Sequence, residues 1–241
     1  MALGERSEMA DYFPVFLSLS GRRVLIVGGG AVAMEKVESL RSSGAIVTIL
    51  APSVGGSIKA EIEAGNLEWI SKSFEPIDVA PYFMVIAATD DPATNAFVFQ
   101  TGNALNRLTN SVDDPENCNF IMSAIVRRGP MQVAVSSSGS SPALAQRLRN
   151  RISEELLTPE VGRLGEFLGR WRPAVKSALG TYKQRQGFWE RVLRSPIPSL
   201  LEVDVLEADT AMAQGLRWAA EHPECLLCGR YETGLRCWEE E

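Results

Sequence analysis

Three consecutive glycines follow a short apolar run, and their spacing gives the clearest chemical signal in the sequence. Residues 24–27 are all apolar and are typical of a strand buried on both faces. Gly28, Gly30 and Ala33 then form the pattern G-x-G-x-x-A at the start of a predicted helix. The first glycine permits a tight turn, the second lets a diphosphate approach the backbone, and the alanine lets the helix pack closely. The turn therefore predicts a dinucleotide site at a helix N-terminus, with a plain tight turn as the alternative.

The end of the second predicted strand bears on which dinucleotide would bind. A carboxylate about 20 residues after the glycine turn usually binds the ribose hydroxyls of NAD. Here the strand at 45–50 is followed by Ala51, Pro52 and Ser53, so neither a carboxylate nor an arginine is present. Backbone groups at Pro52 and Ser53 are the alternative partners, and the residues alone leave NAD and NADP open.

A pair of carboxylates follows the fifth predicted strand, at 108–112. Asp113 and Asp114 stand where open α/β sheets bind ligands, outside the carboxyl end of a strand. A carboxylate there is suited to act as a general base or a metal ligand. Because Asp-Asp-Pro is also good turn chemistry, a solvated turn is the alternative.

Two further groups of residues are suited to bind anions. Small hydroxyl residues occupy 136–138 and 140–141 just before a predicted helix, where they can bind a carboxylate or simply cap the helix. Arginines cluster nearby, and in a chain of net charge −6 they suggest a local acceptor for a polyanion rather than surface charge alone. They are Arg127, Arg128, Arg147, Arg149 and Arg151.

The elements that must position these residues alternate between strand and helix. Strands are predicted at 24–27, 45–50, 67–70, 82–88 and 108–112, with helices at 31–42, 57–64 and 94–105. This order predicts an α/β fold with a Rossmann-like, mostly parallel sheet and helices on both faces. Residues 12–17 read as a short edge segment because Pro14 interrupts an apolar run.

The pattern changes after about residue 113. Strand-like pieces at 120–122, 124–126 and 131–135, with Arg-Gly-Pro as a hairpin turn, predict a small β-rich segment. Helices are predicted from Pro142 onward, at about 159–178, 181–194 and 205–220, with Pro196 and Pro198 as interruptions. We therefore expect four parts, at residues 1–113, 114–150, 151–220 and 221–241.

Composition and charge narrow the class of protein. The chain has 241 residues, of which 45% are hydrophobic and 22% charged, as in ordinary globular proteins. A net charge of −6 argues against broad binding to nucleic acid or anionic membranes. No apolar run approaches the roughly 20 residues that cross a bilayer, and no signal-peptide core is seen. We therefore expect a cytoplasmic protein with reduced thiols.

The C-terminal tail carries a possible metal site. His222, Cys225, Cys228 and Cys237 give the spacing H-x2-C-x2-C-x8-C, which matches a Cys3His ligand set for zinc or an iron–sulfur centre. The alternative is a tail whose cysteines bind nothing specific.

Several blocks, in this order, resemble the precorrin-2 dehydrogenase/sirohydrochlorin ferrochelatase module of siroheme synthases, over about residues 12–195. Ser123 departs from the family, which usually has proline there, and the tail after about residue 200 has no recognised counterpart. The blocks are Phe13-Pro14-Val15-Phe16, the glycine turn with Lys36, Ala87-Ala88-Thr89-Asp90-Asp91, Asn110 to Pro115, Phe120-Ile121-Met122, Arg128-Gly129-Pro130, and Ala134 to Ala145.

The resemblance implies a homodimer with an NAD-binding domain, a β-rich dimerisation segment and a helical C-terminal domain. It implies oxidation of the tetrapyrrole precorrin-2 to sirohydrochlorin with NAD, and in many members insertion of Fe²⁺ to give siroheme. Asp113 aligns with the family's catalytic aspartate and Ser137 with a substrate-loop serine that is phosphorylated in one branch. We expect Arg128 and Arg147 to contact the substrate. The expected cofactor contacts are Gly28, Gly30, Ala31, Val32, Pro52, Ser53 and Thr89.

Two other functions remain open at this point. The first is a non-catalytic module that senses NAD and binds a partner through its helical part. The second is a dehydrogenase that acts on a different tetrapyrrole.

Overall fold

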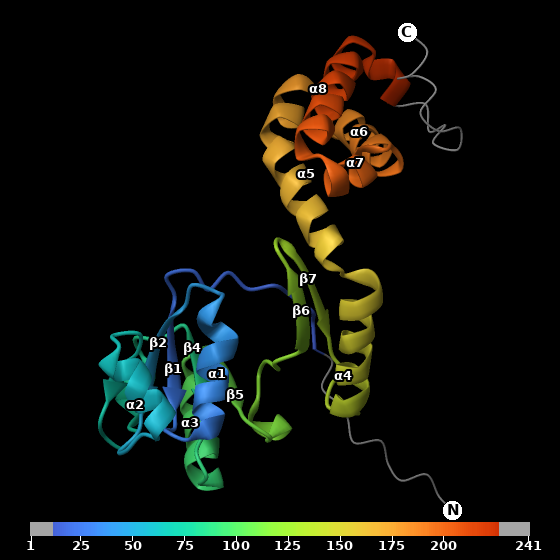
Figure 1. The fold of residues 1–241 in the computed structure, drawn as a ribbon. Coiled ribbons are helices and arrows are strands. Elements are labelled where there is room, and N and C mark those ends of the chain that lie inside the picture. The colour runs from blue at the N-terminus through green and yellow to red at the C-terminus, as the bar shows by residue number, and fades with distance from the viewer. Residues whose placement is uncertain (1–11, 227–241) are drawn as a thin grey trace, which may run out of the picture. The chain divides into compact units, whose positions relative to one another are not determined.

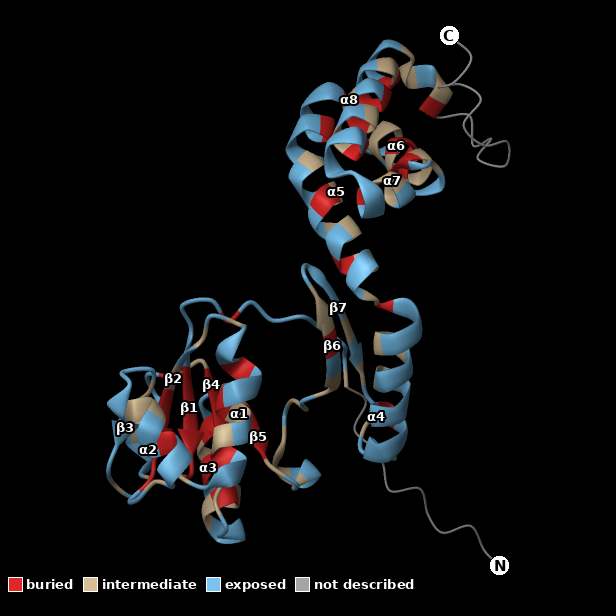
Figure 2. Ribbon diagram, in the orientation of Figure 1, coloured by how far each residue is buried: buried red, intermediate tan, exposed pale blue. Residues whose placement is uncertain are grey.

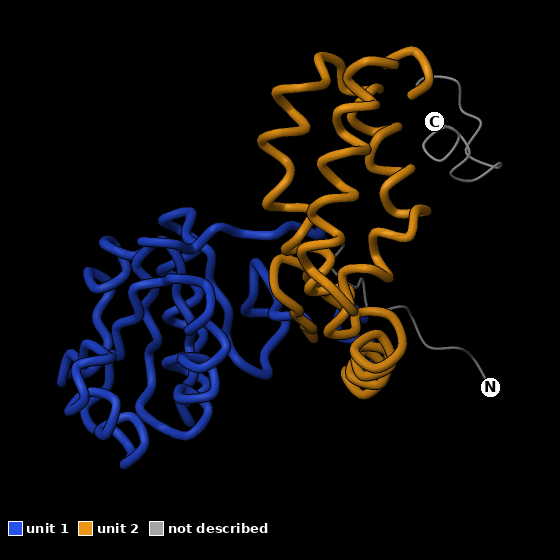
Figure 3. The backbone as a smooth tube through the Cα atoms, turned by 45° about the horizontal axis from the view of Figure 1, so that its top comes forward, with its two compact units in different colours: residues 1–123, 137–141 blue, residues 124–136, 142–241 orange. Residues whose placement is uncertain are grey.

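A computed structural model describes residues 12–226 and divides the chain into two compact units (Figure 3). The first unit contains residues 1–123 and 137–141, and the second contains residues 124–136 and 142–241. The chain therefore passes between the units three times.

The first unit is built on a five-stranded parallel sheet. Its strands are β1 (Arg23–Val27), β2 (Ile46–Leu50), β3 (Glu68–Ile70), β4 (Met84–Ala87) and β5 (Leu108–Ser111), in the spatial order β3-β2-β1-β4-β5. The connecting helices are α1 (Ala31–Arg41), α2 (Gly56–Glu63) and α3 (Pro92–Ala104) (Figure 1). The predicted Rossmann-like sheet is confirmed.

Both faces of the sheet are covered, as the apolar residues of its central strands require. Val24 and Ile26 of β1 pack in one buried cluster with side chains of α1 and α2, whereas Leu25 and Val27 pack in a second cluster that includes Val98 of α3. Successive residues of one strand thus enter opposite cores, because side chains alternate across a strand. Figure 2 shows the central strands buried between the helices.

Two expected strand segments are not strands. Residues 12–17 form no strand, and the side chains of Phe13 and Phe16 are 85% and 69% exposed. Phe120 also lies outside any strand. Its carbonyl accepts a hydrogen bond from the side chain of Asn110, and Cys118 forms an isolated antiparallel bridge with Asn110. In residues 12–17, Pro14 cannot donate a hydrogen bond to a neighbouring strand. In residues 120–122, the Phe120 carbonyl bonds to the side chain of Asn110 instead of to a strand.

The second unit begins with a hairpin and continues as helices. Strands β6 (Ala124–Arg128) and β7 (Met131–Val135) pair antiparallel, and Gly129 between them has φ 52°. The helices are α4 (Pro142–Arg151), which continues as a π-helical turn at Ile152–Leu156, then α5 (Pro159–Ala178), α6 (Tyr182–Arg194), α7 (Ile197–Val203) and α8 (Val205–Glu221). The β-rich segment and the helical C-terminal region are both confirmed.

Helix α7 corrects the expectation that Pro196 and Pro198 simply interrupt the helical region. Pro196 is the N-cap of α7 and Pro198 lies in its first turn. A proline there sacrifices no internal hydrogen bond, because the first N–H groups of a helix have no acceptor within it. The helix buries Ile197 and Leu201 in a cluster with Phe188 of α6 and Met212 of α8. Across residues 12–226, no helix has the length and apolar character that a membrane span requires.

Candidate functional site

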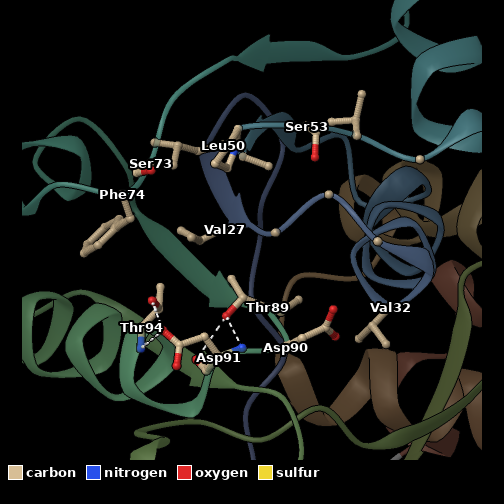
Figure 4. Close-up of a pocket in the computed structure, with 18 of the residues that line it drawn as sticks. Val27, Val32, Leu50, Ser53, Ser73, Phe74, Thr89, Asp90, Asp91 and Thr94 are labelled. Carbon is tan, nitrogen blue, oxygen red and sulfur yellow. Dashed lines mark hydrogen bonds between the residues drawn. The ribbon is translucent and has the colours of Figure 1, made fainter.

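A pocket of about 800 Å³ lies at the carboxyl ends of β1, β2 and β4 (Figure 4). Its volume is in the range of cavities that hold a cofactor. Four segments of the first unit meet there: the glycine turn, the loop after β2, the Ser73–Phe74 segment, and the loop between β4 and α3. The lining includes all seven predicted cofactor contacts: Gly28, Gly30, Ala31, Val32, Pro52, Ser53 and Thr89.

The three glycines of the turn have different surroundings. Gly28 has φ 133°, and a Cβ atom there would lie 2.2 Å from the carbonyl oxygen of Ala88. A Cβ on Gly29 would lie 2.1 Å from the carbonyl oxygen of Ser53. A Cβ on Gly30 would meet nothing within 4 Å, although this residue lines the pocket. The first two glycines are thus required by neighbouring backbone, and the third leaves open space for a ligand.

The start of α1 supplies hydrogen-bond donors to the pocket. Gly30 is the N-cap, and the N–H of Met34 bonds to the Gly30 carbonyl at 3.2 Å. The N–H groups of Ala31 and Val32 precede this first intrahelical bond, so they are available to a ligand as helix N-terminal donors usually are. Together with the helix dipole, they form a site suited to a diphosphate.

The loop between β4 and α3 carries Thr89 and two carboxylates. Asp91 caps α3 by accepting from the N–H groups of Ala93 and Thr94 at 3.2 and 3.1 Å. Hydrogen bonds from the Thr94 hydroxyl, and then from these N–H groups, hold the pKa of Asp91 below its ordinary value. Asp90 and Asp91 are the charged residues of the pocket lining, which contains neither lysine nor arginine.

Sequence reasoning missed three residues of this region. Phe74 and Phe97 line the pocket and form an edge-to-face pair with ring centroids 5.8 Å apart. Asn95 is buried and bonds to Thr89 through its side chain. Phe74 and Phe97 lie 23 positions apart in the sequence, so no local spacing marks them as a pair. The signal for Asn95 is its place in the first turns of α3 among apolar neighbours.

Asp113 stands one residue beyond the Val112 that follows β5, and its side chain is exposed. Its φ is 60°, a left-handed conformation in which aspartate and asparagine are enriched among residues with side chains. Because all five strands run parallel, this turn lies at the same edge of the sheet as the glycine turn, two strands along. Asp113 is not among the residues that line the pocket.

The predicted substrate contacts are divided between the units. Ser137 lies in the first unit, where its hydroxyl accepts a hydrogen bond from the N–H of Ser141 at 2.9 Å. Arg128 and Arg147 lie in the second unit. Arg128 donates to the hydroxyl of Ser153 at 2.9 Å and to the carbonyl of Arg127 at 3.0 Å, whereas Arg147 is exposed.

Only part of the predicted tail site lies within the described residues. His222 places Nδ1 3.0 Å from the carbonyl of Trp218, and its ring stacks on that indole with centroids 4.8 Å apart. The carbonyl of Cys225 accepts a hydrogen bond from Arg191. Cys228 and Cys237 fall outside the described residues. Within residues 12–226, no group of three or more His, Cys, Asp or Glu side chains is arranged to hold a metal ion.

Comparison with known proteins matches three family models in sequence order. A model described as putative NAD(P)-binding matches residues 15–124, one for the central region of sirohaem biosynthesis proteins matches 128–155, and one for the sirohaem synthase dimerisation region matches 160–216. Siroheme synthase 1 of Pectobacterium atrosepticum is 42% identical over 226 residues, which is 93% of this chain and 47% of that protein. The chain belongs to the siroheme synthase family. The putative NAD(P)-binding model thus matches the first unit, and the dimerisation model matches helices of the second.

Other family members and a solved structure agree with this assignment. Siroheme synthase of Actinobacillus pleuropneumoniae is 41% identical over 182 residues, covering 76% of this chain and 37% of that protein. The chain therefore spans less than half the length of these relatives. The solved structure described as SirC, precorrin-2 dehydrogenase, aligns with 87% of this chain and 99% of its own at a TM-score of 0.63 and 23% identity, which shows a shared fold.

Proposed function

We propose that this protein is an NAD-dependent dehydrogenase that oxidises precorrin-2 to sirohydrochlorin in siroheme biosynthesis. The observation that carries the proposal is the pocket at the glycine turn, in a chain that belongs to the siroheme synthase family. The surroundings of Gly30 fit a bound dinucleotide, because a Cβ atom added at this position would meet free space beside the donors at the start of α1. A bound diphosphate would occupy that space.

The charge of the pocket supports NAD rather than NADP. Recognition of the extra 2′-phosphate usually requires an arginine near the end of β2. Among the described residues, none that lines the pocket is basic, and Asp90 and Asp91 add negative charge to it. A second phosphate dianion would therefore be repelled without compensation. Phe74 lies on the side of the pocket away from the glycine turn (Figure 4). Its edge-to-face pair with Phe97, which also lines the pocket, offers apolar surface for a flat heterocycle.

The proposed reaction removes a hydride and a proton from precorrin-2. NAD supplies the hydride acceptor when it is bound. Asp113 is suited to accept the proton, because its exposed carboxylate projects from the sheet edge that also carries the pocket. Neighbouring strands are about 4.8 Å apart, so the ends of β1 and β5 lie about 10 Å apart, a span that one macrocycle can bridge.

The substrate's carboxylates need basic and hydroxyl partners, and the chain offers them. We assign this role to Ser137, Arg128 and Arg147, of which Arg147 is exposed and Arg128 is anchored by Ser153. The matched dimerisation region supports assembly as a homodimer. We further expect a cytoplasmic protein, and a zinc site in the tail at His222, Cys225, Cys228 and Cys237 that metal analysis of the purified protein would test.

The deciding experiment supplies precorrin-2 with NAD or NADP and follows both the tetrapyrrole spectrum and the reduced nicotinamide. We expect one reduced nicotinamide per sirohydrochlorin formed, with kcat/KM at least about tenfold higher for NAD. Binding of NAD without turnover of precorrin-2 would favour a sensing module. Turnover of another tetrapyrrole in its place would identify the substrate as different.

Iron insertion is a second candidate activity. The observation that favours it is the exposed carboxylate of Asp113 in a chain related to proteins named siroheme synthases. This carboxylate could take the protons that the pyrrole nitrogens lose as Fe²⁺, here a substrate, is inserted. Incubation of sirohydrochlorin with Fe²⁺ under anaerobic conditions, with and without the protein, tests it. An equal rate in both samples would contradict the activity.

A further inference from the structure

A row of hydrogen-bonded polar groups connects the loop that carries Thr89 with the turn that carries Asp113. It contains Asn95 of α3, Ser111 of β5 and Cys118 of the segment after β5. Asn95 and Ser111 are 7% and 1% exposed, and the thiol of Cys118 is half-buried. All these groups belong to the first unit. Polar groups this deeply buried are costly unless each has a partner, so their arrangement is specific.

Asn95 holds Thr89 by both ends of its amide. Its Oδ1 accepts from the Thr89 hydroxyl at 2.8 Å and from the Thr89 N–H at 3.2 Å, and its Nδ2 donates to the Thr89 carbonyl at 3.0 Å. Adjacent Ala88 places its carbonyl oxygen against Gly28, where it excludes any Cβ. The side chain of Asn95 thereby fixes a loop that forms one wall of the nucleotide pocket.

The same residue is bonded to the neighbouring strand through its backbone. The Ser111 hydroxyl donates to the Asn95 carbonyl at 3.2 Å. The Ser111 carbonyl in turn lies 3.2 Å from the thiol of Cys118, which is also 3.2 Å from the carbonyl of Asp114. The carbonyls of Ser111 and Asp114 lie before and after Asp113 in the sequence. The Cys118 thiol therefore bonds to both sides of the turn in which Asp113 has a left-handed conformation.

We propose that Asn95 is a positioning residue that holds the Thr89 loop and, through Ser111, keeps it in register with the Asp113 turn. The roles of the two loops rest on the function proposed above, but the connection between them does not. Asn95 itself neither lines the pocket nor bonds to Asp113, and it acts through Thr89 and Ser111.

The connection is tested first without any ligand, by hydrogen exchange on the full chain. We expect Asn95→Ala to lower amide protection in both the 88–91 loop and the 111–118 turn, because it leaves the Thr89 N–H and carbonyl without their partner. Asn150→Ala is the control, since Asn150 is an exposed asparagine of α4 in the second unit. Loss of protection confined to α3, or equal in both variants, would overturn the proposal whether or not NAD binds.

The second test uses Asn95→Asp and measures the Kd of NAD by calorimetry across pH. At neutral pH the ionised carboxylate cannot donate to the Thr89 carbonyl, and we expect a Kd about tenfold higher than in the wild type. Burial and the nearby carboxylates of Asp90 and Asp91 raise the pKa of the introduced acid, while the N-terminal end of α3 lowers it. The hydroxyls of Thr89 and Ser111 are neutral, and burial raises the pKa of the Cys118 thiol, so that it also stays uncharged.

When protonated, the introduced aspartic acid again offers one donor, for the Thr89 carbonyl, and one acceptor, for the Thr89 hydroxyl and N–H. We therefore expect the affinity of Asn95→Asp for NAD to recover toward the wild-type value as the pH falls from about 8 to about 5. The wild type and Asn150→Ala should show no such recovery. A pH-independent defect, or none, would show that the amide does not act through its donor and would contradict the role assigned to it.

The third test separates binding from turnover. Ser111→Ala removes the bond to the Asn95 carbonyl but leaves the amide on Thr89, so the Kd of NAD should stay within about twofold while kcat falls about five- to tenfold. Ser39→Ala, an exposed serine bonded only to its own helix, is the control. An unchanged kcat in Ser111→Ala would refute the link to the Asp113 turn.

Discussion

At the scale of single residues, the conformation of Asp113 makes it possible to remove its charge without changing the backbone turn in which it lies. Its φ of 60° would strain alanine, whereas asparagine adopts this region readily. Asp113→Asn therefore keeps the turn and removes the carboxylate.

We expect Asp113→Asn to lower kcat for precorrin-2 oxidation by about 100-fold or more, because a general base contributes that order of rate. The melting temperature and the Kd of NAD should not change. Asp114→Asn next to it is the control, since the Asp114 carboxylate bonds to the side chain of Asn117. Full activity in Asp113→Asn would exclude it as the proton acceptor, and the same variant tests whether iron insertion shares the group.

The glycine turn allows a second prediction at this scale. A methyl group on Gly30 enters open space, so Gly30→Ala should raise the Kd of NAD at least about tenfold. Because alanine is a poorer N-cap than glycine, it should also lower the melting temperature by about 2–4 °C. Gly28→Ala should instead destabilise the protein far more, since its Cβ meets backbone at 2.2 Å and its φ is 133°. Calorimetry and thermal unfolding of both variants check this, and equal stability of the two would contradict it.

The sequence predicted the residues of the turn better than those that support it. The G-x-G-x-x-A spacing is local, so it identified Gly28, Gly30 and the helix start. The need for Gly29 was missed because it arises from the carbonyl of Ser53, which is 24 positions away. Asn95 was missed although its partner Thr89 lies only six positions away, and its bond to Ser111 forms only when α3 packs beside β5.

At the scale of elements, the cap of α3 makes a pH-dependent contribution to stability. Hydrogen bonds to the charged form lower the pKa of Asp91 in the folded state below its ordinary value of 3.8. This contribution is therefore fully present above about pH 4 and is lost as the pH falls through the lower folded pKa.

We expect Asp91→Ala to lower the melting temperature at neutral pH by about 2–4 °C. Asp91→Asn should retain most of the cap at neutral pH, because asparagine is an equally good N-cap. The wild type should lose stability relative to Asp91→Asn as the pH is lowered from about 5 to about 3. Thermal unfolding over this range measures it, and parallel pH profiles for the two proteins would contradict the assignment.

Elements were predictable where one local pattern dominates. Largely apolar runs identified β1, β2 and β4, because most residues of these central strands are buried between the helices. Helix α7 was not foreseen, since prolines were read as interruptions without regard to the position in the first turn that each occupies. Residues 120–122 were read as a strand from apolarity alone, but the side chain of Asn110 donates a hydrogen bond to the Phe120 carbonyl in that segment.

At the scale of the whole molecule, the order of the chain differs from the order of the units. Residues 137–141 belong with the nucleotide-binding unit, although the hairpin before them and α4 after them belong with the other. The division into four parts predicted from the sequence remains a prediction about domains. Nothing in the local composition of residues 137–141 indicates that they belong with the unit formed by residues 1–123.

A fragment of residues 1–123 contains β1–β5, α1–α3 and every residue that lines the pocket. We expect it to bind NAD with a Kd within about threefold of that of the full chain. It should not oxidise precorrin-2, because Ser137, Arg128 and Arg147 are missing. Calorimetry and the tetrapyrrole assay check both statements, with Gly30→Ala in the fragment as the binding control. Turnover by the fragment would exclude the three residues from substrate binding.

The unequal surroundings of the three glycines have a genetic consequence. Alleles that alter the first or second glycine should behave as temperature-sensitive mutations, with little accumulated polypeptide at high growth temperature and partial recovery in the cold. Alleles at the third should impair activity at every growth temperature, through weaker binding of NAD, while most of the polypeptide still accumulates. Neighbouring codons would thus yield opposite phenotypes, one governed by quality control and the other by loss of catalysis.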